Sequence, residues 1–148
     1  PGIGLLETTN VSVGRGTDTP FEIVGAPWLD GRRLSSYLNA RKLAGVRFVP
    51  VRFKPVASVF KDQECGGVNI IVTDRAQFRS VRAGLEIAVA LRRLYPVDWK
   101  VDDYSRLLVN QETLERLKRG DSPEEIAISW TSALNEFRRA RAKALLYK

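Results

Sequence analysis

The chain of 148 residues contains no histidine, no methionine and a single cysteine, Cys65. A zinc site needs several nitrogen or sulfur ligands, so this composition argues against one. Ser-His and Cys-His nucleophile systems are excluded because histidine is absent, and one cysteine cannot form a disulfide within the chain. Any chemistry here must therefore use carboxylates, hydroxyls or arginines, and we expect no metal and no cofactor.

The sequence has little that marks a membrane protein or a nucleic-acid-binding protein. No apolar segment approaches the roughly 18 residues that a membrane-spanning helix needs. The net charge of +7 arises from 24 basic and 17 acidic residues, and it is spread over both halves of the chain. Nucleic-acid-binding domains concentrate their charge in one patch, so we expect neither a membrane span nor a nucleic-acid partner.

The length and the 44% hydrophobic content fit one globular domain with a core of its own. Because methionine is absent, position 1 is not a native translation start. We therefore expect the chain to be a segment of a longer protein, and a targeting signal upstream would not be visible in it.

The apolar pattern predicts an α+β or α/β fold, with a mixed sheet, packed helices and a helix-rich C-terminal half. Residues 1–28 are expected to form a strand and then a long irregular loop. A helix is expected from Asp30 to a stop signal at Gly45. A strand is expected over residues 46–54, where Pro50 favours an edge position or a bulge. The inner face of the helix is expected to carry Leu34, Tyr37, Leu38 and Arg41.

The second half of the chain is expected to contain a buried strand and then helices. Residues 68–73 form an apolar run that is typical of a buried strand. Asp74 and Gln77 have the spacing of a capping box, which predicts that a long helix begins there and ends near Pro96. The apolar face of this helix is expected to consist of Phe78, Val81, Leu85, Ala88, Leu91 and Tyr95.

Two further helices have clear start signals. Asn110 can cap a short helix that Gly120 ends, with Leu114 and Leu117 on its inner face. The segment SPEE at residues 122–125 offers a hydroxyl cap, a proline and a glutamate at the third position, so the last helix should begin there. The buried face of this last helix is expected to carry Ile126, Trp130, Leu134 and Phe137.

The stretch NVSVGRGT at residues 10–17 is the first candidate site. Gly14 and Gly16 can adopt positive φ, and successive backbone N–H groups in such a turn form an anion-binding concavity. Arg15 adds a planar group that matches a carboxylate. The pattern fits neither a phosphate-binding loop nor a dinucleotide-binding fingerprint, and a purely structural turn is the alternative. Further donors and acceptors are Asn10, Ser12 and Thr17.

Two other places in the sequence are candidates for chemistry. Glu7 follows two leucines, and a half-buried carboxyl at a strand end would suit a general acid, although an exposed strand residue is the alternative. The segment at residues 61–67 precedes the buried strand, and its polar side chains can hydrogen-bond hydroxyls. Its cysteine is expected to be a small, inert residue. Its glycine pair indicates a close approach of another segment or a sharp entry into the strand. The candidates in this segment are Gln63, Glu64, Cys65 and Gly66.

Three segments carry a resemblance to a known family. They are LLETTNVSVGRGTDTPFEIVGAPW at residues 5–28, GVRFVPVRFKPVASVFKDQECGGVNIIVTDR at residues 45–75, and the ending with SPEEIAISW and FRRARAKALLYK. Together they resemble the bacterial exo-β-N-acetylmuramidase family, which was long catalogued as a domain of unknown function. One departure is Thr8, which stands where many members carry glycine.

The resemblance implies that residues 1–148 are the C-terminal, auxiliary subdomain of a glycoside hydrolase and that a Rossmann-like catalytic subdomain precedes them. The family removes N-acetylmuramic acid from the non-reducing end of peptidoglycan fragments, so the implied location is periplasmic or secreted. The active site is expected in the cleft between the subdomains, with the principal catalytic glutamate upstream. The residues of this sequence expected at that cleft are Glu7, Asn10, Ser12, Gly14, Arg15, Gly16 and Thr17, followed by Gln63, Glu64, Cys65 and Gly66.

The residues and the resemblance point to one interaction. N-acetylmuramic acid carries a lactyl carboxylate that N-acetylglucosamine lacks, and Arg15 between two glycines is a suitable receptor for it. Glycosidic cleavage typically uses two carboxyl groups, and we expect one from the upstream subdomain and one from this chain, Glu7 in preference to Glu64. The expected partners are therefore a peptidoglycan-derived saccharide and the upstream subdomain. The alternative is a non-catalytic module that binds anionic cell-wall glycans.

Overall fold

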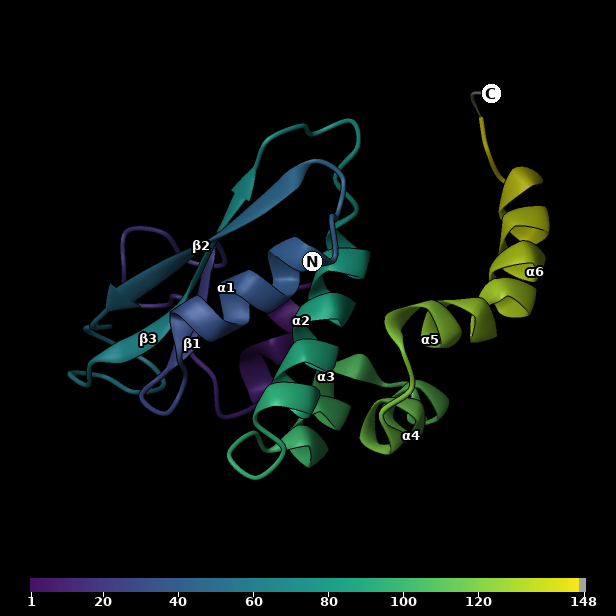
Figure 1. The fold of residues 1–148 in the computed structure, drawn as a ribbon. Helices are drawn as coiled ribbons and strands as arrows, with labels where there is room; N and C mark the ends of the chain where they lie inside the picture. Colours follow the sequence, from purple (N-terminus) through teal and green to yellow (C-terminus); the bar gives the residue numbers. More distant parts are fainter. Residues whose placement is uncertain (147–148) are drawn as a thin grey trace.

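A three-stranded antiparallel sheet and a group of helices beside it make up residues 1–146, which are the residues that this computed structural model describes (Figure 1). The strands β1 (Ile23–Ala26), β2 (Val46–Phe53) and β3 (Cys65–Val72) lie in the order β1-β3-β2. Helix α1 (Gly31–Ala40) lies between the sheet and helix α2 (Ser80–Leu94). The expected α+β class is confirmed, although both strand pairs are antiparallel where a mixed sheet was expected.

The central position of β3 follows from its apolar sequence. Val68 and Ile70 are buried on the face that α1 covers, and they pair with Pro50 and Phe48 of β2. Because β2 is an edge strand, Pro50 can lie within it without removing a hydrogen bond between two inner strands. The strand prediction for residues 46–54 and the edge position of Pro50 are therefore confirmed.

The first residues of the chain form a short 3-10 helix, η1 (Gly4–Thr8), and not the expected strand. The backbone N–H of Leu6 donates to the carbonyl of Ile3 at 3.0 Å, which is the spacing of a 3-10 turn. The side chain of Leu6 is fully buried, so packing of this leucine into the core decides the local conformation. Strand β1 lies inside the region that was expected to be a loop.

Helix α1 begins as the sequence predicts, whereas α2 does not. The carboxylate of Asp30 accepts hydrogen bonds from the N–H groups of Arg32 and Arg33, which is a regular N-cap. Asp74 instead stabilises a separate turn by accepting from the N–H groups of Ala76 and Gln77, and α2 begins six residues after it, at Ser80. The predicted cap at Asp74 is therefore wrong.

The predicted apolar stripe on α2 is too narrow. The expected position Val81 is 51% exposed, whereas nine consecutive residues from Ala83 to Leu91 are buried. Neighbouring segments pack around α2 from several sides, including α1, η1, α4 (Gln111–Arg119) and α5 (Pro123–Ser129). The part of α2 from Ala83 to Leu91 is buried on every side, and such a segment does not need an amphipathic pattern.

The caps predicted for the C-terminal helices are confirmed. Before them lie η2 (Val101–Tyr104) and α3 (Ser105–Leu108). Asn110 accepts from the N–H of Thr113 at the start of α4, and Gly120 ends that helix in the left-handed conformation. Ser122 and Glu125 form a complete capping box at the start of α5.

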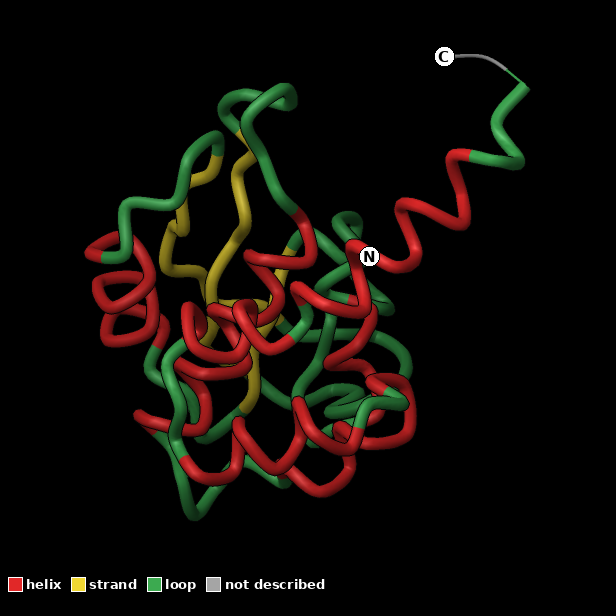
Figure 2. The backbone as a smooth tube through the Cα atoms, turned by 90° about the vertical axis from the view of Figure 1, so that its right-hand side faces the viewer, coloured by secondary structure: helices red, strands yellow, loops and turns green. Residues whose placement is uncertain are grey.

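The expected single last helix is divided at Trp130 into α5 and α6 (Thr131–Ala142). Ile126 of α5 is fully buried, but Leu134 and Phe137 of α6 are 43% and 62% exposed, so the predicted buried face of the last helix is wrong beyond Trp130. Figures 1 and 2 show α6 leading away from the rest of the domain. Within residues 1–146 no helix has the length and apolar character to cross a bilayer. Tyr147 and Lys148, in the predicted C-terminal segment, lie outside the described residues.

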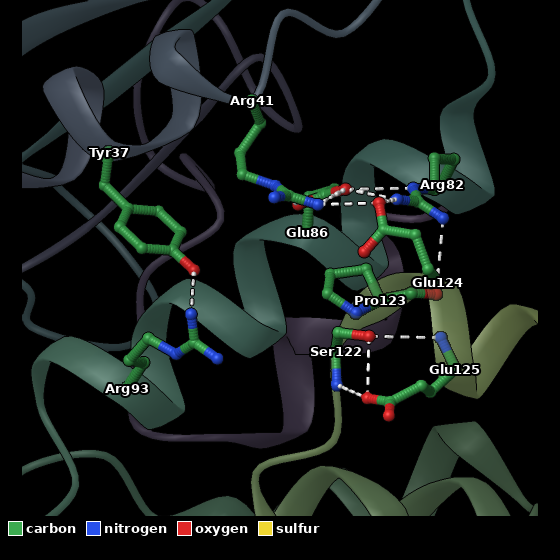
Figure 3. Close-up of polar contacts among 9 residues, drawn as sticks. All are labelled: Tyr37, Arg41, Arg82, Glu86, Arg93, Ser122, Pro123, Glu124 and Glu125. Atoms are coloured by element: carbon green, nitrogen blue, oxygen red, sulfur yellow. Dashed lines mark hydrogen bonds and ion pairs between the residues drawn. The ribbon is translucent and has the colours of Figure 1, made fainter.

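Buried charge joins α1, α2 and α5 (Figure 3). The carboxylate of Glu86 on α2 is fully buried and accepts from Arg41, at the end of α1, and from Arg82 on α2. Glu124 on α5 pairs with the same two arginines. The helices are thus held together by ionic contacts as well as by apolar packing.

Candidate functional site

The glycine-arginine-glycine stretch forms a tight turn. The backbone N–H of Thr17 donates to the carbonyl of Gly14 at 3.1 Å, and the Thr17 hydroxyl donates to the same oxygen at 2.7 Å. Gly14 and Gly16 have φ angles of 83° and 78°. A Cβ atom at Gly16 would lie 2.4 Å from the backbone nitrogen of Ala57, so both conformation and packing require glycine there. The stretch is a turn, and a binding role must come from the groups that the turn leaves free.

Arg15 provides those free groups. Its side chain is 51% exposed, its Nε donates to Glu7, and its guanidinium carbon lies 5.0 Å from the centroid of the Phe21 ring. Within residues 1–146 the two terminal nitrogens of Arg15 make no hydrogen bond, and neither do the backbone N–H groups of Arg15 and Gly16. The hydrogen bond and the charge of Glu7 raise the pKa of Arg15 above its ordinary value. The turn therefore presents a permanent planar cation with unused donors, which suits a carboxylate.

Glu7 lies in η1 and not at the end of a strand. Its side chain is 32% exposed and forms an ion pair with Arg15. The contact with Arg15 uses Oε1 of the Glu7 carboxylate, and a role for Glu7 as a general acid stays a prediction. In the observed arrangement the contact orients Arg15.

The other polar residues of the stretch are used within the fold. The side chain of Asn10 donates to the carbonyl of Asp98 and accepts from the N–H of Lys100, each at 2.7 Å. Ser12 is buried and forms an isolated bridge with Gly25 of β1, while its hydroxyl accepts from the N–H of Gly14 at 3.2 Å. These residues hold the turn in place, whereas the terminal nitrogens of Arg15 have no hydrogen-bond partner within residues 1–146.

A separate open cleft of about 990 Å³ lies between the start of α1, the end of β2 and the start of β3. Glu64 and Gly66, predicted from the sequence, line this cleft, whereas none of the residues of the 10–17 turn does. A Cβ atom at Gly66 would lie 2.2 Å from the carbonyl oxygen of Leu29, which confirms the close approach expected at the glycine pair. Lining residues that the sequence analysis did not select are Trp28, Asp30, Arg32 and Arg52.

Tyr95, directly after α2, contacts two residues that line the cleft, Asp30 and Trp28. The Tyr95 hydroxyl donates to the carbonyl of Asp30 and accepts from its N–H, both at 3.1 Å. Burial raises the pKa of Tyr95, so the phenol keeps the proton that it donates. The Tyr95 ring packs against Trp28, with centroids 5.4 Å apart. The indole N–H of Trp28 is buried and has no hydrogen-bond partner within the described residues.

Charged groups at the other side of the cleft are exposed. Glu64 and Arg52 form an ion pair of 3.1 Å, with side chains 67% and 84% exposed. A cleft with an aromatic side chain, mixed charges and exposed donors can hydrogen-bond the hydroxyl and amide groups of a saccharide. Trp28 could have been selected from the sequence as an aromatic residue after a glycine-rich loop, but Asp30 carried only a capping signal.

The two remaining candidates have little part in either place. Gln63 is exposed at the surface, and its side chain makes no hydrogen bond within residues 1–146. Cys65 is fully buried, and burial raises the pKa of its thiol. The thiol therefore stays protonated, which agrees with the expectation that it is inert.

Comparison with known sequences identifies one family. Residues 1–147 match the family described as the C-terminal part of exo-β-N-acetylmuramidase NamZ. The chain is 37% identical over 150 aligned positions to the peptidoglycan β-N-acetylmuramidase NamZ of Bacillus subtilis (strain 168). That alignment covers 99% of this chain and 36% of the relative, so the chain spans about a third of the relative's length.

Two solved structures have the same fold. Both are crystal structures of DUF1343 family proteins from Bacteroides fragilis NCTC 9343, and each match covers 99% of this chain. One is 25% identical with a TM-score of 0.67 and is covered over 40% of its length. The other is 23% identical with a TM-score of 0.72 and is covered over 39%.

Proposed function

Because the chain belongs to the family of exo-β-N-acetylmuramidase C-terminal domains, we propose that it is the auxiliary part of a glycoside hydrolase that releases N-acetylmuramic acid from the non-reducing end of peptidoglycan fragments. In this proposal it supplies saccharide-binding groups to a cleft shared with a catalytic part, and the protein acts in the periplasm or outside the cell. The relative from Bacillus subtilis, named for activity on peptidoglycan, supports the proposal.

The substrate assignment rests on one observation, namely that the Arg15 guanidinium is held in place while its terminal nitrogens lack a partner in the described part of the chain. The turn fixes its backbone, Glu7 and Phe21 hold the guanidinium, and its two terminal nitrogens have no partner within residues 1–146. A lactyl carboxylate can receive both nitrogens in a bidentate contact. An exposed ion pair such as that of Arg15 with Glu7 is weak, so a ligand carboxylate can also replace Glu7.

Discrimination between sugars follows from the same contact. Once a saccharide covers the turn, Arg15 loses part of its water and needs an anionic partner. N-acetylmuramic acid provides that partner, whereas N-acetylglucosamine leaves the two terminal nitrogens of Arg15 desolvated and without an anionic partner, since Glu7 contacts only Nε. A site built around a polar contact rejects an analogue without the polar group strongly.

The test is the variant Arg15→Ala in the intact enzyme, with Arg75→Ala as the control, because Arg75 is exposed and makes no side-chain contact that the structure records. We expect kcat/KM on a muramic-acid glycoside to fall by about 10- to 150-fold, as for loss of a charge-assisted contact of about 1.5–3 kcal/mol. The rate on the matching N-acetylglucosamine glycoside should change much less.

Unchanged activity of Arg15→Ala on the muramic-acid glycoside would remove Arg15 from substrate recognition. Equal losses on both glycosides would indicate a folding role. If the intact protein binds muramic-acid saccharides but hydrolyses none, the domain is a glycan-binding module, which is the alternative function.

A further inference from the structure

Helix α6 buries none of its twelve residues, and within residues 1–146 it shares this property only with the four-residue helix α3. It follows α5 directly and contacts no other helix or strand to a comparable extent. Its first residue has no side-chain cap, and Figure 2 shows the helix extending away from the domain. A helix of twelve residues without packing is only marginally stable in water, so this helix needs a surface to pack against.

The face that needs covering is apolar. Leu134 and Phe137 of α6 are 43% and 62% exposed, and they are three residues apart, which places them on one side of the helix. Ile128 of the preceding α5 is 71% exposed, and Leu145 after α6 is 47% exposed. The surface that covers this face must therefore be an apolar groove. A helix that binds in such a groove usually does so through several apolar side chains at helical spacing.

The charge of α6 narrows the choice of partner. The helix carries Arg138, Arg139 and Arg141 against a single acidic residue, Glu136. Arginines beside an apolar stripe favour a groove with carboxylates at its edge.

The size of the helix decides between a separate molecule and the same polypeptide. A twelve-residue helix is about 18 Å long and about 10 Å wide, so the face that it offers is a few hundred Å², well below the roughly 800 Å² per partner of a stable protein–protein interface. Within one polypeptide a contact this small suffices, because covalent linkage gives an effective concentration on the order of millimolar. The relatives offer such a partner, since 60% or more of each matched chain lies outside the part that this chain covers.

We propose that α6 is a clamp that docks its Leu134 and Phe137 face into an apolar, acid-edged groove on the catalytic part of the same polypeptide. The proposal rests on the proposed function only in that it assumes this longer polypeptide. Docking at α6 would fix the relative orientation of the two parts and thereby the width of the cleft between them.

The test compares hydrogen exchange of the backbone amides of α6 in the 148-residue chain and in the intact polypeptide as its gene encodes it. We expect fast exchange in the former and exchange slowed by at least about tenfold in the latter. Phe137→Asp in the intact polypeptide should restore fast exchange. Phe137→Leu should retain the protection, and so should Val97→Asp, which changes a 92% exposed valine outside α6.

Equally fast exchange in both forms would overturn the proposal. Protection that appears in the 148-residue chain as its concentration rises would overturn it in favour of a second copy. Protection that appears only with anionic phospholipid vesicles would overturn it in favour of a membrane surface. Exchange is measured without substrate, so protected α6 amides in a polypeptide that hydrolyses nothing would support the clamp while contradicting the proposed function.

Discussion

The fully buried carboxylate of Glu86 offers the sharpest test of what holds the helices together. Its Oε1 accepts from the Nη2 and Nε of Arg82 at 2.6 and 3.0 Å, and its Oε2 accepts from the Nε of Arg41 at 3.0 Å (Figure 3). The variant Glu86→Gln keeps the shape of the side chain but removes its charge. It also turns an amide NH₂ group toward a guanidinium group, and both are donors.

The size of the effect follows from the surroundings of the two arginines. Removing one partner of a buried ion pair typically costs about 3–5 kcal/mol. Arg41 and Arg82 are 33% and 28% exposed and both keep Glu124 as a partner, which limits the charge left uncompensated. We therefore expect the lower end of that range, about 3 kcal/mol, and a fall in Tm of about 6–12 °C.

Urea denaturation and thermal unfolding measure this change. Glu124→Gln is the matched variant in the same network, and because Glu124 is 52% exposed it should cost less than about 1 kcal/mol. Glu136→Gln on α6 is the surface control and should change neither measurement. A loss below about 1 kcal/mol for Glu86→Gln would show that the buried ion pairs contribute little, and the reasoning would fail.

Two further predictions concern the turn and the last cap. Gly16→Ala should lower the free energy of unfolding by about 1–3 kcal/mol, because φ is 78° and the new Cβ would meet the Ala57 backbone; an unchanged urea midpoint would contradict this. The pKa of Glu125 lies below its ordinary value because the N–H and hydroxyl of Ser122 donate to it. That contribution to stability is present above the ordinary carboxyl pKa and is lost as the pH falls through the lowered value. Ser122→Ala should therefore cost about 1 kcal/mol at pH 7 and less at pH 3, and an equal cost at both pH values would refute the linkage.

Local signals predicted helix starts well where the capping residue and the helix are adjacent in sequence, whereas the predicted stop of the first helix at Gly45 is wrong because α1 ends at Ala40. Asp30, Asn110 and Ser122 each cap the helix that follows them, since a cap depends on a few neighbouring atoms. Asp74 has the same local chemistry, but it closes a turn and α2 starts later. The sequence pattern could not distinguish a capped turn from a capped helix because both use the same hydrogen bonds.

Properties that depend on distant contacts were beyond the sequence. Glu86 lies within an apolar run and gives no sign that arginines at positions 41 and 82 will meet it. The cleft combines Trp28 and Asp30 with Arg52 of β2 and with Glu64, which precedes β3, and only the tertiary fold brings these together. The periodic pattern from Ile126 to Phe137 is real, but periodicity shows that a face is apolar and not what covers it.

The candidate site divides into residues that build it and residues that remain free. Asn10, Ser12 and Gly16 are each used by hydrogen bonds or close packing within the domain, so replacing them should change stability first and any activity as a consequence. Arg15 differs because its terminal nitrogens have no internal role within residues 1–146. A loss of activity at Arg15 with unchanged stability is therefore evidence for ligand binding, whereas the same loss at Ser12 or Gly16 is not. Membership in a motif is thus a weaker guide to a binding role than the unused hydrogen-bonding capacity of the folded chain.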